Sequence, residues 1–145
     1  MTNTIPKTSR SLPIALLRAR ERVMSPIRKM LVDVGVTEQQ WRVLRVLQES
    51  GEMEPTRIAE EACLLLPSLT RILQRLEEKN LISRQKDKRD RRKQVVRISA
   101  DGAALIEANR EASVAIVEDL RNRIGEDRYE ALLDLLNDLD RPDPD

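Results

Sequence analysis

The stretch LISRQKDKRDRRKQVVRIS, residues 81–99, decides the fold of this chain. It contains two short runs, Leu81–Lys86 and Gln94–Ser99, separated by the charged hexapeptide Asp87–Arg92. Alternation of apolar and polar residues in both runs predicts two β-strands, and hence a β-hairpin with a basic tip. Packing explains such a tip poorly, whereas contact with phosphates and with a nucleic-acid groove explains it well.

Two short helices are predicted immediately before this hairpin. Glu54-Pro55 opens the first, with proline at the first helical position, where its missing amide costs nothing. A tight turn, Cys63–Leu66, leads to a second helix that Pro67 starts and Asn80 ends, because asparagine tolerates the left-handed conformation that terminates a helix. Two helices around a tight turn, followed by a hairpin, predict a winged helix-turn-helix over residues 36–99.

Two further helices are predicted on the N-terminal side. The first extends from Leu12 to about Val34 and contains Pro26, which predicts a kink or a break just before that proline. The second follows Thr37 and Gln40, which have the spacing of a capping box, and it ends at Ser50-Gly51.

The C-terminal side is also predicted to be helical. Ser99 is expected to cap a long helix that continues through Ile124 and is ended by Gly125. A last helix is predicted over Asp127–Leu139, and the proline-containing tail Arg141–Asp145 is expected to be frayed. The fold class predicted from these patterns is mainly α with a small β-wing.

The flanking helices, residues 12–34 and 100–140, carry more apolar side chains than the small winged lobe can cover. Five leucines of the last helix occupy a wide arc: Leu132, Leu133, Leu135, Leu136 and Leu139. Pairing of these helices between two chains would bury the arc and place two recognition helices about 34 Å apart, one turn of DNA. The alternative is a monomer that folds its last helices onto itself. We therefore expect dimerisation helices on both sides of one winged lobe.

Composition agrees with one helical domain of 145 residues. Charged residues make up 35% and hydrophobic residues 40%, with one Trp, one Tyr and no Phe, so the core must consist of aliphatic side chains, which suits packed helices. No stretch approaches the roughly 18 apolar residues that span a bilayer. The segment Met1–Ser11 lacks the apolar centre of a signal peptide, and a single cysteine fits a reducing cytoplasm. A cytoplasmic protein with no membrane partner is expected.

The net charge of +1 conceals a strong asymmetry along the chain. From Arg71 to Arg97 there are eleven Lys and Arg against four acids, a net charge of 11 − 4 = +7. From Glu118 to Asp145 there are four arginines against ten acids, a net charge of 4 − 10 = −6. A solvated surface is the ordinary explanation of one charged run, but segregation of this size favours one surface that faces a polyanion.

The second helix of the pair has the pattern of a recognition helix. Its apolar residues recur at the spacing of one buried stripe, and five polar side chains fall on or beside the opposite face: Ser68, Thr70, Arg71, Gln74 and Arg75. Arg71 or Arg75 is suited to the O6 and N7 atoms of guanine, and Gln74 to adenine. The N-terminal half of such a helix usually meets the bases, which favours Ser68, Thr70 and Arg71. The alternative for each residue is an ordinary solvated position.

The hairpin tip is expected to contribute contacts of a different kind. Arg89 and Arg91 are candidates to enter a minor groove, where negative potential is concentrated. Phosphates or nearby acids are expected to pair with the other three cations: Lys88, Arg92 and Lys93. Asp87 and Asp90 would repel phosphate, so we expect them to hold the arginines in place by salt bridges within the loop.

Catalytic and metal-binding patterns are absent from the sequence. There is no His, the commonest general base and metal ligand, and four scattered glycines form no phosphate loop. No enzyme activity, cofactor or metal is therefore expected. Cys63 is expected to be a small buried apolar residue; a redox-sensing role is the alternative, although no second cysteine is present to resolve an oxidised intermediate.

Several of these segments resemble the MarR family of transcriptional regulators. PSLTRIL at 67–73 and LISR at 81–84 resemble that family's recognition helix and first wing strand, and Asp87–Arg92 resembles its wing. ALLRARE at 15–21, Met24-Ser25, TEQQWR at 37–42 and Ala-Cys at 62–63 are similar to the branch that represses homoprotocatechuate degradation operons. The resemblance extends from about Leu12 to Ile106. Asn80 departs from the glycine usual at that position, which concerns a helix cap and not function.

The resemblance implies a homodimeric repressor that binds a pseudo-palindromic operator and is released by a small phenolic or aromatic acid. It places the effector pocket between the dimer helices and the DNA-binding lobe, which points to Arg20, Ser25 and Trp41. A guanidinium would bind the carboxylate of the acid and an indole its ring. Trp41 is equally explained as a core residue that packs with Val36. A MarR-like redox sensor acting through Cys63 and a protein-interaction module on the same scaffold are the other functions left open.

Overall fold

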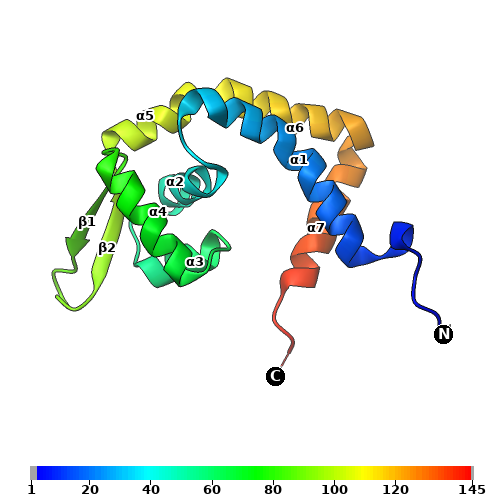
Figure 1. Cartoon of the computed structure of the whole chain (residues 1–145), viewed down its shortest axis with the longest axis horizontal. Coiled ribbons are helices and arrows are strands. Elements are labelled where there is room, and N and C mark those ends of the chain that lie inside the picture. The colour runs from blue at the N-terminus through cyan, green and yellow to red at the C-terminus, as the bar shows by residue number, and fades with distance from the viewer. Residues whose placement is uncertain (1–2, 145) are drawn as a thin grey trace. The chain divides into compact units, whose positions relative to one another are not determined.

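A computed structural model describes residues 3–144 of the chain (Figure 1). Its elements, in chain order, are η1 (Thr8–Arg10), α1 (Leu12–Val34), α2 (Glu38–Ser50), α3 (Pro55–Glu61), α4 (Leu66–Glu78), β1 (Ile82–Lys86), β2 (Gln94–Ile98), α5 (Ala100–Ala108), α6 (Arg110–Ile124) and α7 (Glu126–Asp140). The described residues thus contain seven α-helices and one antiparallel sheet of two strands, which confirms the mainly α fold with a small β-wing.

The elements form two compact units. One unit is Ile27–Arg110, which contains the end of α1, helices α2 to α5 and the hairpin. The other unit consists of the residues up to Pro26 together with those from Glu111 onward, and it contains most of α1 and of α6 and all of α7.

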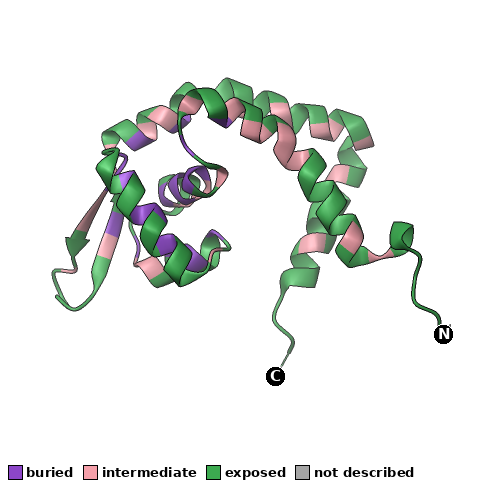
Figure 2. Cartoon of the chain, in the orientation of Figure 1, coloured by how far each residue is buried: buried purple, intermediate pink, exposed green. Residues whose placement is uncertain are grey.

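The hydrophobic core belongs to Ile27–Arg110. Its largest fully buried side chains come from α2, α3, α4 and β2: Val43, Leu44, Leu47, Ile58, Leu69, Leu73, Leu76 and Val96. Figure 2 shows that the buried positions recur along α4 as a stripe. Each fully buried leucine contributes about 2 kcal/mol relative to an exposed one, so this stripe fixes which face of α4 turns outward.

Side-chain caps begin two of the helices, as the sequence predicts. The Thr37 hydroxyl accepts the Gln40 amide at 3.1 Å, and the Gln40 side-chain oxygen accepts the Thr37 amide at 3.1 Å, which is a complete capping box. At the start of α5 the Ser99 hydroxyl accepts the Gly102 amide at 3.0 Å and donates to the Asn80 carbonyl at 2.7 Å. Ser99 therefore joins the start of α5 to the end of α4.

The predicted hairpin is confirmed. β1 and β2 pair antiparallel from Ile82↔Ile98 to Lys86↔Gln94, which leaves residues 87–93 as the tip. Met53, between α2 and α3, adds two backbone hydrogen bonds to Val96, of 3.1 and 2.9 Å. The base of the hairpin is therefore fixed to the core, and its tip extends beyond it.

Close packing also fixes α5 against the hairpin. Gly102 lies in the first turn of α5, and a Cβ atom there would stand 2.3 Å from the carbonyl oxygen of Leu81. A side chain of any size would push α5 away from the first residue of the hairpin stretch, so this position requires glycine.

One prediction about a helix interruption is wrong. The long helix expected through Ile124 is interrupted at Asn109, whose side-chain amide donates to the Leu105 carbonyl at 2.8 Å while its backbone amide donates to Ile106. An asparagine side chain competes in this way with the helical hydrogen bonds. Of the kink or break predicted before Pro26, the break is excluded, because α1 continues from Leu12 to Val34 with Pro26 inside it.

Smaller boundaries differ by single residues. α4 begins at Leu66 and α7 at Glu126, one residue before the positions predicted, and Asn80 adopts the expected left-handed conformation with φ of 61°. Of the tail Arg141–Asp145 that we expected to be frayed, Arg141–Pro144 form no helix and Asp145 lies outside the described residues.

The second unit has no core of its own. Among its described residues none is buried, although α6 and α7 carry many apolar side chains. α6 and α7 are joined by Arg121, whose guanidinium pairs with Glu126, lies 2.8 Å from the Glu130 carboxylate and stacks over the Tyr129 ring at 4.6 Å. The turn between the helices is Gly125, with φ of 94°.

Candidate DNA interface and effector site

The outer face of α4 is entirely exposed. Because Leu69, Ile72, Leu73 and Leu76 turn into the core, the five polar residues predicted to read DNA lie on solvent-facing positions: Ser68, Thr70, Arg71, Gln74 and Arg75. The Thr70 hydroxyl donates to the Leu66 carbonyl at 3.1 Å. The other four side chains form no hydrogen bond or ion pair with any part of the chain that the structure describes.

The first turn of α4 has a feature that the sequence patterns did not indicate. Its N-cap residue is Leu65, and no side chain caps this turn, in contrast to α2 and α5. Backbone amides at an uncapped helix start favour an anion, and a phosphate is the anion that a DNA duplex presents.

The hairpin tip is held by its two aspartates. Asp87 accepts the Arg89 backbone amide at 2.7 Å, and Asp90 accepts the Arg92 backbone amide at 3.1 Å. Asp90 also pairs with the Arg92 guanidinium, with Nε to Oδ1 at 3.1 Å. Both aspartates thus accept backbone amides, a role that the sequence interpretation did not include. The predicted salt bridge to an arginine is found for Asp90 and, among the described residues, not for Asp87.

The hydrogen bonds at Asp90 also affect its titration. Donation from the Arg92 side chain, followed by donation from the Arg92 amide, lowers the pKa of Asp90 below its ordinary value of 3.8. A carboxylate whose pKa is lowered on folding stabilises the fold above the unfolded pKa, and this contribution is lost as the pH falls through the folded pKa. The tip is therefore held in place throughout the neutral range.

Acids outside the tip pair with Arg84 and Arg97 at the base of the hairpin and with Lys93 where the tip meets β2. Arg84 lies 2.9 Å from Glu77, whose pKa is lowered chiefly by this hydrogen bond, and Arg97 lies 2.6 Å from Glu52. Lys93 lies 3.6 Å from Glu54.

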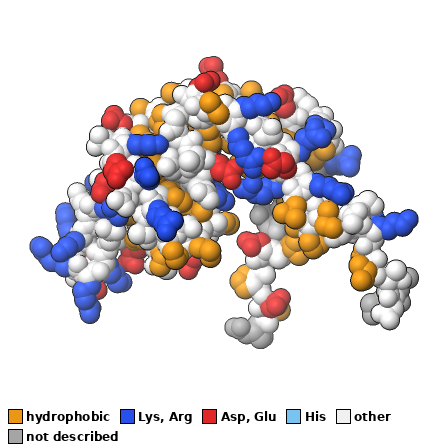
Figure 3. Space-filling view, viewed as in Figure 1, with side chains coloured by type: hydrophobic (Ala, Val, Ile, Leu, Met, Phe, Trp, Pro, Cys, Tyr) orange, Lys and Arg blue, Asp and Glu red, His pale blue; other side chains and the backbone are white. Residues whose placement is uncertain are grey.

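Six cations of the basic segment remain without a protein partner among residues 3–144: Arg71, Arg75, Lys86, Lys88, Arg89 and Arg91. All six are exposed, two on the outer face of α4 and four at the end of the hairpin. Figure 3 shows Lys and Arg side chains gathered over the end of the hairpin. Of the wing cations named from the sequence, Lys88, Arg89 and Arg91 are in this unpaired group, whereas Arg92 pairs with Asp90 but keeps a side chain that is 92% exposed.

The residues assigned to an effector lie in both units. Ser25 lines a pocket of about 530 Å³ together with Arg18, Glu21 and Arg22, and Arg20 is exposed on the same helix. Arg18, Arg22 and Ser25 follow one another at steps of four and three residues, so one face of α1 presents two guanidiniums and a hydroxyl. The sequence interpretation missed both of these arginines, although their spacing was visible.

Trp41 belongs to the other unit and is only 8% exposed. It lies in the core with Val36, as the packing alternative predicted.

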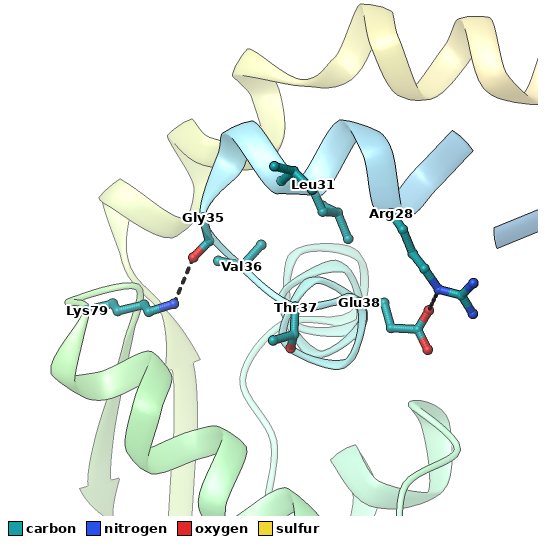
Figure 4. Close-up of a pocket in the computed structure, with 8 residues that line it drawn as sticks. Arg28, Leu31, Gly35, Val36, Thr37, Glu38 and Lys79 are labelled. Atoms are coloured by element: carbon teal, nitrogen blue, oxygen red, sulfur yellow. Dashed lines mark hydrogen bonds and ion pairs between the residues drawn. The ribbon is translucent and has the colours of Figure 1, made fainter. Parts of the chain in front are cut away.

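A second pocket, of about 410 Å³, lies within Ile27–Arg110 (Figure 4). The end of α1, the start of α2 and Lys79 line it. At one side Arg28 pairs with Glu38 at 3.4 Å, and at the other Lys79 donates to the Gly35 carbonyl at 2.8 Å.

The prediction that Cys63 is buried is wrong: its side chain is exposed. Cys63 follows the end of α3 in the left-handed conformation, with φ of 55°, where the chain turns toward α4. Its neighbours Ala62 and Leu64 enter or border the core, and this turn directs the residue between them outward.

The described residues contain neither a metal-binding cluster nor a membrane-spanning helix. No group of three or more His, Cys, Asp or Glu side chains among residues 3–144 is arranged to hold a metal ion. None of the helices in the same range has the length and apolar character needed to cross a membrane.

A helix-turn-helix followed by a basic hairpin defines a winged-helix protein. A sequence model of the MarR family matches residues 36–94. The HTH-type transcriptional regulator FarR of Neisseria gonorrhoeae is 36% identical over 129 residues, which cover 89% of this chain and 88% of FarR. The chain therefore belongs to the MarR family and is a transcriptional regulator, which confirms the resemblance seen in its recognition helix and wing.

Two further proteins are similar to this chain, one over a shorter part of it than FarR and one over nearly all of it. The homoprotocatechuate degradative operon repressor of Escherichia coli is 46% identical over 95 residues, 66% of this chain and 64% of the repressor. The crystal structure of NadR in complex with 4-hydroxyphenylacetate superposes with a TM-score of 0.84 at 34% identity, over 99% of this chain and all of NadR.

Proposed function

We propose that this MarR-family regulator is a homodimeric repressor of an operon for aromatic-compound catabolism, of homoprotocatechuate or 4-hydroxyphenylacetate, and that a small phenolic or aromatic acid releases it from a pseudo-palindromic operator. One observation carries the proposal: within Arg71–Arg97, the cations left without a protein partner lie on the outer face of α4 and at the end of the hairpin, the two elements with which winged-helix proteins meet DNA.

The outer face of α4 is assigned to base readout. Ser68, Thr70 and Arg71 lie in its first half, where a recognition helix meets base edges. Gln74 and Arg75 lie one turn further on and are assigned to adjoining bases or phosphates. A guanidinium with no acid to bind is available for the O6 and N7 atoms of guanine, which supports the assignment for Arg71 and Arg75.

The hairpin tip is assigned to the minor groove and the backbone. Arg89 and Arg91 have no competing acid, which suits insertion into a groove of negative potential. Lys88 and Arg92 are assigned to phosphates. Asp87 and Asp90, which accept backbone amides within the tip, are assigned to holding it in one conformation, and this supports their role as wing-structuring residues.

Dimerisation is supported by the unit that lacks a core. Its exposed large apolar side chains come from α1, α6 and α7: Leu12, Leu16, Leu17, Val114, Val117, Leu132, Leu133, Leu135 and Leu139. A surface with so many exposed apolar groups marks an interaction site in a soluble protein. A second copy of the chain covers it by symmetry, since each chain then contributes the same surface. The dimerisation helices are therefore assigned to residues 12–34 and 100–140.

The effector is assigned to the N-terminal half of α1. Ser25 and Arg20 are the residues named from the sequence, and Arg18 and Arg22 add two guanidiniums suited to a carboxylate. The volume of about 530 Å³ is within the range of small-molecule sites. Trp41, the third residue named from the sequence, is proposed for the aromatic ring of the effector, although it belongs to the core and only 8% of its surface is exposed.

The two similar proteins support the choice of effector. One is named as the repressor of a homoprotocatechuate degradative operon, and the other was crystallised with 4-hydroxyphenylacetate. We extend this aromatic chemistry to the present chain. We also place the regulator in the cytoplasm, where operator DNA is found, and assign it no catalytic activity.

Binding of a selected duplex tests the proposal. The wild-type protein is used to select a duplex from a random-sequence pool, and affinity is then measured by fluorescence anisotropy with and without 4-hydroxyphenylacetate. The expected result is a two-fold symmetric sequence, released by the acid. Arg22→Met should require about tenfold more acid, the loss expected for one charge-assisted contact, and Arg10→Met, outside the pocket, should respond like the wild type. Binding without salt dependence would instead indicate a protein-interaction module.

A redox-responsive regulator is a second candidate, favoured by the exposure of Cys63. Such a regulator would lose its selected duplex on treatment with hydrogen peroxide and keep it in Cys63→Ser. Retention of the duplex by peroxide-treated wild type would exclude this candidate.

A further inference from the structure

Lys79 is the cation of the basic segment whose side chain turns to the protein backbone. It follows the last residue of α4, and its backbone amide donates to the Arg75 carbonyl at 3.1 Å. Its ammonium donates to the Gly35 carbonyl at 2.8 Å and lies 3.3 Å from the side-chain oxygen of Gln40. These partners precede it by 44 and 39 residues, so the contact ties the end of the recognition helix to the turn between α1 and α2.

Both partners suit a cation. Gly35 directly follows α1, and the C-terminal end of a helix carries partial negative charge. Gln40 is buried, with 7% of its surface exposed, and the oxygen that faces Lys79 is the one that closes the capping box with the Thr37 amide. The ammonium therefore stands where the end of α1, the start of α2 and the end of α4 meet, as Figure 4 shows for Gly35 and Lys79.

The contact supplies something that the core beneath α4 does not. The buried stripe of α4 is apolar, and apolar packing is not directional. The polar bonds of Lys79, together with that between Ser99 and the Asn80 carbonyl, have fixed geometry and act on the C-terminal end of the helix. The opposite end has no side-chain cap.

The angle at which the C-terminal end of α4 is held determines where its N-terminal half, which is assigned to base readout, lies. Ser68 precedes Lys79 by eleven residues, about 16 Å along a helix at 1.5 Å per residue. A tilt of about 5° at Lys79 would therefore move Ser68 by about 1.4 Å, more than a hydrogen bond to a base edge tolerates.

We propose that Lys79 is a positioning residue for operator recognition: it holds the recognition helix at the angle needed to read bases and does not itself contact DNA. This inference rests on the proposed function, since it requires α4 to meet DNA. It departs from the sequence interpretation, in which Lys79 was one of the eleven cations of a surface that faces a polyanion.

Three variants separate positioning from phosphate contact. Lys79→Met removes the ammonium and keeps the length of the side chain, Lys79→Arg keeps a donor, and Lys88→Met removes a wing cation with no protein partner. Affinity is measured by fluorescence anisotropy over 50–200 mM salt, for the duplex selected by the wild type and for a scrambled duplex of the same composition.

The expected result is specific to sequence. Lys79→Met should bind the selected duplex about fivefold more weakly, the size of one exposed charge-assisted hydrogen bond, with the scrambled duplex and the salt slope unchanged. Lys79→Arg should recover most of the loss. Lys88→Met should weaken both duplexes and flatten the slope by about 1.8 per dimer, since a phosphate contact contributes about 0.9 per chain. Unchanged binding of the scrambled duplex also shows that the variant is folded.

Two results would overturn this inference and leave the proposed function standing. In one, Lys79→Met binds the selected duplex as tightly as the wild type does. In the other, Lys79→Met weakens binding of both duplexes, as Lys88→Met does. A wild type that binds neither duplex would overturn the proposed function, and this inference with it.

Discussion

Removal of the Arg91 charge should flatten the salt dependence of DNA binding, whereas removal of the Arg97 charge should not. Both arginines are exposed and belong to the hairpin stretch, but Arg97 lies 2.6 Å from Glu52 and Arg91 has no partner within the described chain. The six unpaired cations of Arg71–Arg97 give twelve per dimer, so these residues contribute at most about −11 to the slope of log K against log salt, at 0.9 per phosphate contact. Arg91→Met removes one of these cations from each chain, and although Arg91 is assigned to the groove, its charge also displaces counterions there, so the slope should flatten by up to about 1.8.

The size of this change makes the experiment decisive. Between about 50 and 200 mM salt, a difference of 1.8 in slope changes the relative affinity by about tenfold. Anisotropy titrations of the wild type, Arg91→Met and Arg97→Met against one duplex at four salt concentrations resolve such a difference. Equal slopes for Arg91→Met and the wild type would refute the reasoning that unpaired cations mark the DNA-facing surface. A flatter slope in Arg97→Met would refute the assignment of its charge to Glu52.

Three further predictions concern other parts of the interface and the dimer. Arg71→Ala should relax sequence choice at one base pair of each half-site by about 1–3 kcal/mol, measured by repeating the selection, and an unchanged consensus would count against base contact. Asp90→Ala should weaken binding of all sequences, and because the pKa of Asp90 is lowered below its ordinary 3.8, the contribution of this carboxylate to wild-type binding should persist to about pH 4, where an ordinary aspartate is already partly protonated, and be lost only at lower pH, as titrations at falling pH would show. Leu135→Asp with Leu139→Asp should dissociate the dimer in sedimentation experiments, whereas Leu65→Asp, at an exposed apolar residue of the other unit and outside the assigned dimerisation helices, should not.

Features determined by neighbouring residues could be predicted from the sequence. The capping box of Thr37 and Gln40, the cap by Ser99 and the hairpin depend on spacings of a few residues, and the structure has all of them. The outer face of α4 followed from the periodicity of its buried stripe, since a 3.6-residue repeat with four apolar positions leaves one choice of face.

The failures come from local competition that composition does not reveal. Asn109 ends α5 because its amide takes the Leu105 carbonyl, and nothing in a generally helical stretch signals that outcome. Cys63 is exposed because one residue in the left-handed conformation reverses the direction of the chain, although cysteine between two apolar neighbours usually enters a core.

The pairing of charges lay beyond sequence reasoning for a different reason. Arg97 and Glu52 are 45 residues apart, and Lys79 and Gly35 are 44 apart. A count of charges along Arg71–Arg97 gives the net value of 11 − 4 = +7 but does not distinguish the cations that acids neutralise from those that remain.

That distinction explains how a chain with a net charge of +1 can bind a polyanion. Long-range attraction to DNA depends on the charge that faces the duplex, because charges more than about 8–10 Å away are screened at physiological salt. Acids near the base of the hairpin, such as Glu52 and Glu77, neutralise Arg97 and Arg84 there. The six unpaired cations at the end of the hairpin and on the outer face of α4 keep their charge. The neutralised base of the hairpin lies against the core, and the charged tip extends from it. Electrostatic attraction to DNA therefore acts on the tip and on the outer face of α4, and this turns the recognition helix toward the bases.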